Sequence, residues 1–411
     1  MTAAAPTPSP YAFSYRGFRF FWLTTLLVSF AVQIMSVSIA WQIYDVTGNA
    51  FLLGLVGLCL FLPALLLILV TGLTADRFSR RAIMAVCLCI ELCCALGFLA
   101  FVNAEAHEVW PIFAILVVLG VARAFWGPAA NSLAPNLVPP VALANAITTN
   151  ASAWQAASIM GPAAGGLLYG VSPVVAFATA GALLCCAFVC VLLIPRPPVH
   201  STQQAKSLQS VLAGFRYIFS NKVVLGAISL DMFAVLMGGA VALLPVYAKD
   251  ILHAGPEELG LLRAAPGAGA IVMAVILTRF PVRDHAGRLL FIFVGLFGAF
   301  TVLFGFSTTA WLSVAALTLV GASDMVSVTI RETIMQLWTP EAVRGRVNAV
   351  NSVFVGASNE LGEFRAGTVA ALIGPVPAVV LGGFGAMAVA GAWAMLFPEL
   401  RRQRRLDQHH A

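Results

Sequence analysis

Long apolar runs separated by short polar segments constrain this chain more than any other feature. A hydrocarbon core needs about 20 apolar residues per helical crossing, and only 10% of the 411 residues are charged, against about 25% in a soluble domain. A water-soluble globule is therefore excluded, and the sequence predicts an all-α membrane protein with twelve transmembrane helices. The runs lie at residues 20–44, 52–74, 82–103, 110–131, 144–170, 173–194, 222–248, 258–279, 288–306, 311–337, 345–373 and 376–397.

The positions of Lys and Arg predict the orientation. Apart from four arginines inside the apolar runs, Lys249 is the only one of the 23 Lys and Arg residues that falls on the side opposite the termini. Because short cytoplasmic loops carry an excess of basic residues, we expect both termini in the cytoplasm. This distribution also makes the net charge of +6 a topology signal, and we expect no nucleic-acid partner.

The two halves of the chain repeat each other. Residues Gly120–Pro139 align with Gly321–Pro340 at an offset of 201, and each half holds six runs. A parallel repeat of six helices is the plan of a two-bundle transporter with its site at the repeat interface. The predicted parts are an N-terminal bundle at 1–194, a linker with an amphipathic helix at 195–220, a C-terminal bundle at 221–398 and a basic cytoplasmic tail at 399–411.

Enzymatic chemistry has no candidate residues in this sequence. None of the three lysines, Lys206, Lys222 and Lys249, follows a GxxxxG phosphate loop, which argues against an ATPase. All six histidines lie outside the membrane runs, and HExxH does not occur. We therefore expect that the protein is not an enzyme and has no metal site. We also expect no cofactor, with a proton as the coupling ion.

The segment after the second run carries a charged turn. Its sequence, GLTADRFSRR at 72–81, resembles the GxLaDRxGRR loop signature of the major facilitator superfamily, with Ser79 in place of the usual glycine. A tight turn with an Asp and several Arg can hold two bundles together in one state; the alternative is that the arginines only set topology. The predicted latch residues are Gly72, Asp76, Arg77, Arg80 and Arg81.

The fifth run carries a glycine-proline signature. Residues 157–166 resemble the GxxxGPxxGG motif of drug:proton exporters in that superfamily, with Ala157 replacing the first glycine. Small residues let helices approach closely, and a proline bends the helix. The resemblance favours export over import, although a packing role alone is the alternative. The motif residues are Gly161, Pro162, Gly165 and Gly166.

Charged residues inside the membrane runs are the candidates for proton coupling. Residues 123–127 resemble the RxxxG signature that the same exporters use in coupling. An arginine in hydrocarbon costs about 2.5–3.5 kcal/mol and needs a partner or a cavity. A carboxylate whose arginine partner moves between states can take up and release a proton. The candidates are Arg123, Asp231, Asp324, Arg331, Glu332, Glu360 and Glu363.

Two of these groups have an alternative reading. Arg331–Glu332 and Glu363–Arg365 could be permanent structural ion pairs, whereas Asp231 and Asp324 have no obvious local partner. Glu91, midway along the third run, receives no role from the sequence.

The resemblance also implies a substrate cavity. In the superfamily the first, fourth, seventh and tenth helices line the central cavity, and an aromatic and methionine-rich wall suits amphipathic molecules. Lipid contact or packing is the alternative for each aromatic residue. The candidates are Gln33, Trp41, Gln42, Tyr44, Asp45, Trp126, Phe233 and Met237.

Segments 206–219 and 339–347 further resemble the linker and the TPExxRGRv loop of the branch that contains the enterobactin exporter and macrolide efflux proteins. We therefore expect a monomeric, multi-pass protein of the bacterial cytoplasmic (inner) membrane. It would export a small amphipathic molecule, siderophore or drug-like, by proton-coupled alternating access. The alternatives are a metabolite importer or facilitator of the same fold and a non-transporting membrane sensor.

Overall fold

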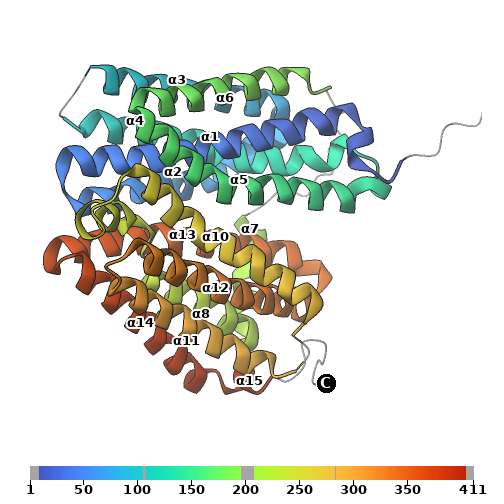
Figure 1. Ribbon diagram of the computed structural model, residues 1–411. Helices are drawn as coiled ribbons and strands as arrows, with labels where there is room; N and C mark the ends of the chain where they lie inside the picture. The colour runs from blue at the N-terminus through green and yellow to red at the C-terminus, as the bar shows by residue number, and fades with distance from the viewer. Residues whose placement is uncertain (1–8, 105–107, 196–207, 283, 404–411) are drawn as a thin grey trace, which may run out of the picture. The chain divides into compact units, whose positions relative to one another are not determined.

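The computed structural model describes residues 9–104, 108–195, 208–282 and 284–403, which form helices and no strand (Figure 1). The chain divides into two compact units. Unit 1 comprises Met1–Ser38 and Leu62–Ala205, and unit 2 comprises Ile39–Phe61 and Lys206–Ala411. The last part of the first helix and the start of the second thus belong with the C-terminal half of the sequence.

Unit 1 is a bundle of long helices. Its α3 packs against α4 and α6, and Phe98 of α3 stacks on Phe177 of α6 with ring centroids 5.6 Å apart. Its elements are η1 (Ala12–Ser14), the first part of α1 (Arg16–Thr47), the second part of α2 (Ala50–Arg77), α3 (Arg80–Asn103), α4 (Trp110–Leu133), η2 (Ala134–Leu137), η3 (Pro140–Ala142), α5 (Leu143–Val171) and α6 (Pro173–Leu193).

Unit 2 is a second bundle, in which α10 packs against α12, and α11 against both α12 and α14. Its seventh span is broken: α8 ends at Gly238, and the chain continues through two short turns into a π-helix, η5. The elements are α7 (Leu208–Ser220), α8 (Lys222–Gly238), η4 (Val241–Leu243), α9 (Leu244–Val246), η5 (Tyr247–Ile251), α10 (Pro256–Arg279), α11 (Ala286–Gly305), α12 (Ala310–Trp338), α13 (Glu341–Ile373), α14 (Pro375–Leu396) and α15 (Pro398–Arg402).

Ten helical segments of the described chain are long and apolar enough to cross a membrane. The remaining two long helices, α5 and α13, have spanning length but carry more polar residues, among them Asn150 in α5 and Glu360 and Glu363 in α13. Together these twelve long helices agree with the predicted all-α membrane fold.

The helix predicted in the linker is present as α7. Tyr217 on this helix donates a hydrogen bond of 2.5 Å to the carbonyl of Trp338 in α12, and Ile218 is buried. Phe215 packs edge-on against Phe354 of α13. Phe215, Tyr217 and Ile218 of α7 therefore pack within unit 2, whereas Phe219 is exposed. The predicted bundle boundaries remain a prediction, and most of the linker and the tail lie outside the described residues.

Helices α10 and α12 touch along their backbones. A Cβ on Gly321 of α12 would lie 1.9 Å from the carbonyl oxygen of Pro266, and one on Gly269 would lie 1.9 Å from that of Thr318. Such distances are far below van der Waals contact, so only glycine allows this approach. In membranes, where lipid is as apolar as the side chains, close backbone packing of this kind holds helices together.

Replacing Gly321 by alanine should therefore force α10 and α12 apart and destabilise the fold by about 1–3 kcal/mol, the usual cost of overpacking. Gly295→Ala in α11 is the matched control, because a Cβ there meets nothing within 4 Å. The measurement is the thermal unfolding midpoint of both variants in detergent. Equal midpoints would contradict the backbone contact.

Candidate functional site

Unit 2 contains a buried ion pair between two helices. Asp231 of α8 and Arg331 of α12 form a salt bridge, and their side chains are only 8% and 5% exposed. Arg331 lies seven residues after Asp324, which places the two on one face of α12. The field of Arg331 acts on both carboxylates, and Asp231 also acts on Asp324. One guanidinium thus forms an ion pair with Asp231 and lies within electrostatic range of Asp324.

A small cavity adjoins this cluster and is large enough for about one water molecule. Asp231 and Asp324 both line it, together with Ser327. The Nε of Arg331 makes no hydrogen bond to the described residues. A water here would have several polar partners, so the site could relay a proton between the carboxylates. The lining residues are Asp231, Ala234, Val235, Val294, Phe297, Asp324 and Ser327.

Arg331 does not form the ion pair with its sequence neighbour Glu332 that the sequence left open. Arg331 turns into the bundle and meets Asp231, whereas its sequence neighbour Glu332 is exposed. Consecutive helical residues point about 100° apart, so adjacent charges rarely share a surface. Asp231 has a partner that sequence proximity could not reveal, because 100 residues separate the two.

A second charged group lies between α10 and α13. Arg263 of α10 is within electrostatic range of Glu363 and Glu360 of α13. Sequence reasoning did not propose Arg263 as a site residue, although an arginine in the middle of an apolar run is itself a signal of a partner or a cavity. The two predicted carboxylates are thus brought together, again with a single arginine.

Arg365 does not form the pair with Glu363 that the sequence left open. Its Nε donates a hydrogen bond of 2.8 Å to the carbonyl of Leu236, and its Nη2 donates to the carbonyl of Met237. These are among the last carbonyls of α8, which lack partners within the helix. Arg365 therefore caps α8 where the seventh span breaks.

Unit 1 holds a buried glutamate with a half-buried arginine within electrostatic range. Glu91 of α3 is 2% exposed, and Arg123 of the neighbouring α4 is the cation that acts on it. Sequence analysis singled out Arg123 but gave Glu91 no role. A buried glutamate needs such a partner, so the two are best described together.

The glycine-proline motif packs α5 against α1 within unit 1. A Cβ on Gly161 would lie 2.6 Å from Cβ of Gln33, and one on Gly165 would lie 3.0 Å from Cα of Ile34. Pro162 and Gly166 are buried beside them. The contact accounts for the small residues of the motif, and it places Gln33 against α5.

The other predicted cavity residues lie at several different places. Phe233 of α8 packs on Trp393 of α14 with centroids 5.1 Å apart, and the carbonyl of Met237 accepts from Arg365. Trp41 is buried, whereas Gln42 and Trp126 are half-buried.

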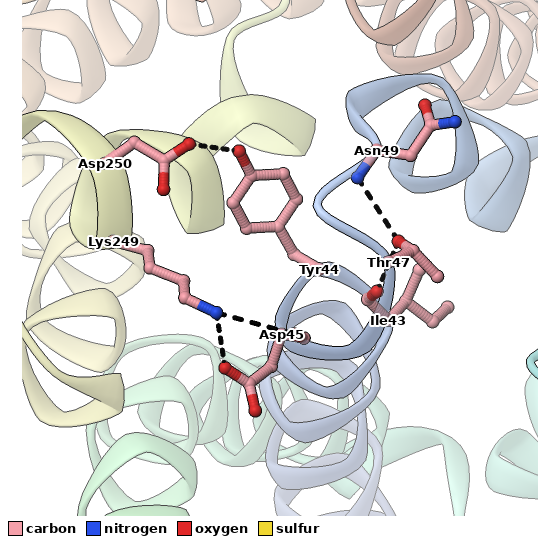
Figure 2. A network of polar contacts seen from close by, with 7 residues as sticks. All are labelled: Ile43, Tyr44, Asp45, Thr47, Asn49, Lys249 and Asp250. Carbon is pink, nitrogen blue, oxygen red and sulfur yellow. Dashed lines mark hydrogen bonds and ion pairs between the residues drawn. The ribbon is translucent and has the colours of Figure 1, made fainter. Parts of the chain in front are cut away.

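Tyr44 and Asp45, at the end of α1, join a polar network with the π-helix η5 (Figure 2). Tyr44 donates to Asp250, and Asp45 pairs with Lys249. These two candidates are therefore engaged with protein groups in this state.

Of the predicted latch, Gly72 is half-buried and Arg77 is exposed, while the side chain of Asp76 lies outside the described residues. Arg80, also half-buried, begins α3. Arg81 donates a hydrogen bond of 2.5 Å to the carbonyl of Leu192 at the end of α6. This contact joins the start of α3 to the end of α6.

Comparison with known families decides the class of this protein. The sequence profile of the major facilitator family described as "Transmembrane secretion effector" matches residues 7–410. The chain belongs to the major facilitator superfamily. It is therefore a multi-pass membrane transporter and not an enzyme.

Two named relatives align over nearly the whole chain. "Enterobactin exporter EntS" from Shigella boydii serotype 4 is 27% identical over 405 residues, which cover 95% of this chain and 94% of the relative. The protein of the same name from Escherichia coli O127:H6 is 28% identical, over 93% of this chain and 89% of its own.

Solved structures share the fold of this major facilitator protein. A bacterial homologue of the human lysosomal transporter Spinster matches with a TM-score of 0.73 at 14% identity, covering 97% of both chains. A bacterial homologue of the iron transporter ferroportin matches with a TM-score of 0.70 at 17% identity, covering 94% of this chain and 99% of that one.

Removing Arg331 should leave Asp231 buried without its counter-charge. We expect Arg331→Met to destabilise the protein by about 3–5 kcal/mol, as for other broken buried pairs. The double variant Asp231→Asn with Arg331→Met should recover most of that loss, because Asp324 is then the one carboxyl group left in the cluster and can stay protonated and neutral. Thermal unfolding midpoints in detergent measure both effects.

Glu332→Gln is the matched control, since it changes the exposed neighbour of Arg331. A double variant no more stable than Arg331→Met alone would contradict the ion pair.

Proposed function

We propose that this transporter exports a small amphipathic molecule, siderophore-like or drug-like, from the cytoplasm in exchange for protons. Two relatives named as enterobactin exporters, each aligned over about nine-tenths of the chain, support the direction and the substrate class. The glycine-proline motif on α5 supports export as well. We further propose that the protein works as a monomer in the bacterial cytoplasmic membrane with both termini in the cytoplasm.

The observation that carries proton coupling is the cluster of Asp231, Asp324 and Arg331. One arginine can neutralise one carboxylate, and a second buried carboxylate without a counter-charge is costly. The protonation state of lowest free energy is therefore the one in which the two carboxylates hold a single proton between them. If Arg331 moves relative to α8 during the cycle, the carboxylate that holds the proton changes, and the proton can be taken up on one side and released on the other.

Alternating access supplies that movement. Asp231 lies on the seventh span and Asp324 on the tenth, and in the superfamily these helices line the substrate path. A substrate that moves Arg331 toward the protonated carboxylate would release the proton, because a nearby cation favours the charged form of the carboxyl group. Binding of substrate and proton would then exclude each other, as antiport requires.

The test uses proteoliposomes with a dye-reported pH gradient and a panel of siderophores, macrolides and lipophilic cations. We expect one class of compound to collapse the gradient with the wild-type protein. Asp324→Asn should abolish this proton movement while the variant still inserts and binds the same compound. Asp284→Asn, which neutralises an exposed loop aspartate, is the control and should behave as wild type.

Unchanged proton-driven efflux in Asp324→Asn would remove Asp324 from the mechanism. Transport of a compound with no accompanying proton movement in the wild type would favour a facilitator of the same fold.

Glu91, with Arg123 within electrostatic range, is a second candidate for coupling, because a charged side chain in hydrocarbon is costly to keep for structure alone. We expect Glu91→Gln to lower the number of protons moved per substrate and to slow coupled transport about tenfold or more. Glu91→Asp, which keeps the carboxylate, should retain the wild-type ratio. An unchanged ratio in Glu91→Gln would mean that the pair serves only folding.

A further inference from the structure

A short helix follows the last span and packs against the rest of unit 2 (Figure 1). This helix, α15, contacts α8, α11 and α14, and its Leu400 is completely buried. Gln403, just after the helix, is buried as well. The segment beyond the final crossing is therefore held on the bundle in a defined position, although it contributes no residue to the charged clusters of the spans.

Backbone contact with α11 holds α15 in this position. A Cβ on Gly287 of α11 would lie 1.9 Å from the carbonyl oxygen of Leu400, so only glycine fits there. The N–H of Gly287 donates a hydrogen bond of 3.0 Å to the carbonyl of Gln403. A Cβ on Gly226 of α8 would meet the ring of Phe397 at 2.8 Å. Glycines on two different helices thus make room for the same segment.

Three exposed arginines stand beside this contact. Arg288 follows Gly287 in α11, and Arg401 and Arg402 follow Leu400 in α15. Within the part of the chain that the structure describes, no ion pair involves any of the three. Several uncompensated charges of one sign on a small surface attract ions of the opposite sign.

The neighbouring carboxylates do not cancel this charge. Glu399 of α15 pairs at 3.8 Å with Lys222, the first residue of α8. Asp284, in the loop before α11, is exposed. On α15 and the starts of α8 and α11, four basic residues therefore stand against these two carboxylates. We refer to Lys222, Arg288, Arg401 and Arg402 as the basic surface.

An apolar surface lies next to the basic surface. In the last turn of α14, Met395 and Leu396 are 74% and 66% exposed. Because α14 is long and apolar enough to span the membrane, these side chains face the acyl chains of the lipid. The chain reaches α15 only two residues later, at Pro398. Apolar and positively charged surfaces in this order complement the two parts of a phospholipid, its acyl chains and its phosphate.

We propose that the basic surface binds the phosphate of an anionic phospholipid, whose acyl chains lie along the last turn of α14. Arginine suits this ligand, because its planar guanidinium donates two parallel hydrogen bonds to a phosphate. A lipid with a net negative charge is favoured over a zwitterionic one, in which a cationic group cancels the charge of the phosphate. The docking of α15 fixes where the arginines stand, so position contributes to binding as well as charge.

Lipid binding to the full-length protein in neutral detergent tests the proposal. The probe is labelled phosphatidylglycerol, and phosphatidylcholine is the zwitterionic comparison. We expect the wild type to bind phosphatidylglycerol about tenfold more tightly or better, because basic residues near the membrane surface attract anionic headgroups. Arg401→Gln with Arg402→Gln should weaken this binding about tenfold.

A matched control removes the same charge elsewhere. Arg16 and Arg19 are exposed at the start of α1 and are expected on the same side of the membrane as α15. Arg16→Gln with Arg19→Gln should keep the affinity for phosphatidylglycerol within about twofold of wild type, since distant exposed charges are screened by salt.

Gly287→Ala tests the contribution of position, because it displaces α15 and keeps every charge. We expect it to weaken binding of phosphatidylglycerol about fivefold, through the loss of a fixed arrangement of the arginines. Gly295→Ala in the same helix is the control, since a Cβ there meets nothing within 4 Å. If Gly287→Ala does not fold, the two arginine variants decide the question by themselves.

Equal losses in the two double-arginine variants would overturn the proposal, because binding would then follow total charge. Equal affinity for the two lipids would overturn it as well. Displacement of phosphatidylglycerol by inorganic phosphate at equal concentration would identify a soluble anion as the occupant instead. A folded Gly287→Ala with wild-type affinity would show that the docked position of α15 plays no part. Since no substrate or gradient is present, the result does not depend on the proposed transport activity.

Discussion

The cost of a charged side chain in hydrocarbon is the constraint on which the rest of this structure depends. Insertion of an arginine or aspartate costs about 2.5–3.5 kcal/mol, so each one in a span needs a partner. The described chain provides such partners between neighbouring helices: Glu91 with Arg123, Asp231 with Arg331, and the Glu360 and Glu363 pair with Arg263. The group of Asp231, Asp324 and Arg331 contains two carboxylates and one arginine, which is the arrangement that can hold a proton.

Backbone contact between small residues supplies the packing around these charges. Gly321 and Gly269 bring α10 and α12 together, and Gly161 and Gly165 do the same for α5 and α1. Lipid gives no hydrophobic reward for burying a large apolar side chain, so close approach of backbones becomes the main attraction.

Sequence alone predicted the all-helical fold well and the site only in part. Run length and the signatures at residues 72–81 and 157–166 depend on local patterns, and they identified the superfamily. The partner of Asp231 lies 100 residues away, and that of Glu91 is 32 residues away on the next helix. Periodicity places a residue on a face but does not say which helix covers that face. From the sequence, Glu332 was therefore considered as the ion-pair partner of Arg331, and Glu363 as that of Arg365. In the structure Arg331 pairs with Asp231, and Arg365 caps α8.

The central claim is that the movements of protons and substrate are thermodynamically coupled. The most direct test finds the pH difference at which net substrate movement stops. Vesicles at zero membrane potential receive a tenfold gradient of the substrate, and the opposing pH difference that stops its net movement is determined. For one proton exchanged per uncharged substrate, the account predicts a balance at about one pH unit, because both gradients then store the same free energy. Net substrate movement that no pH difference can halt would contradict coupling.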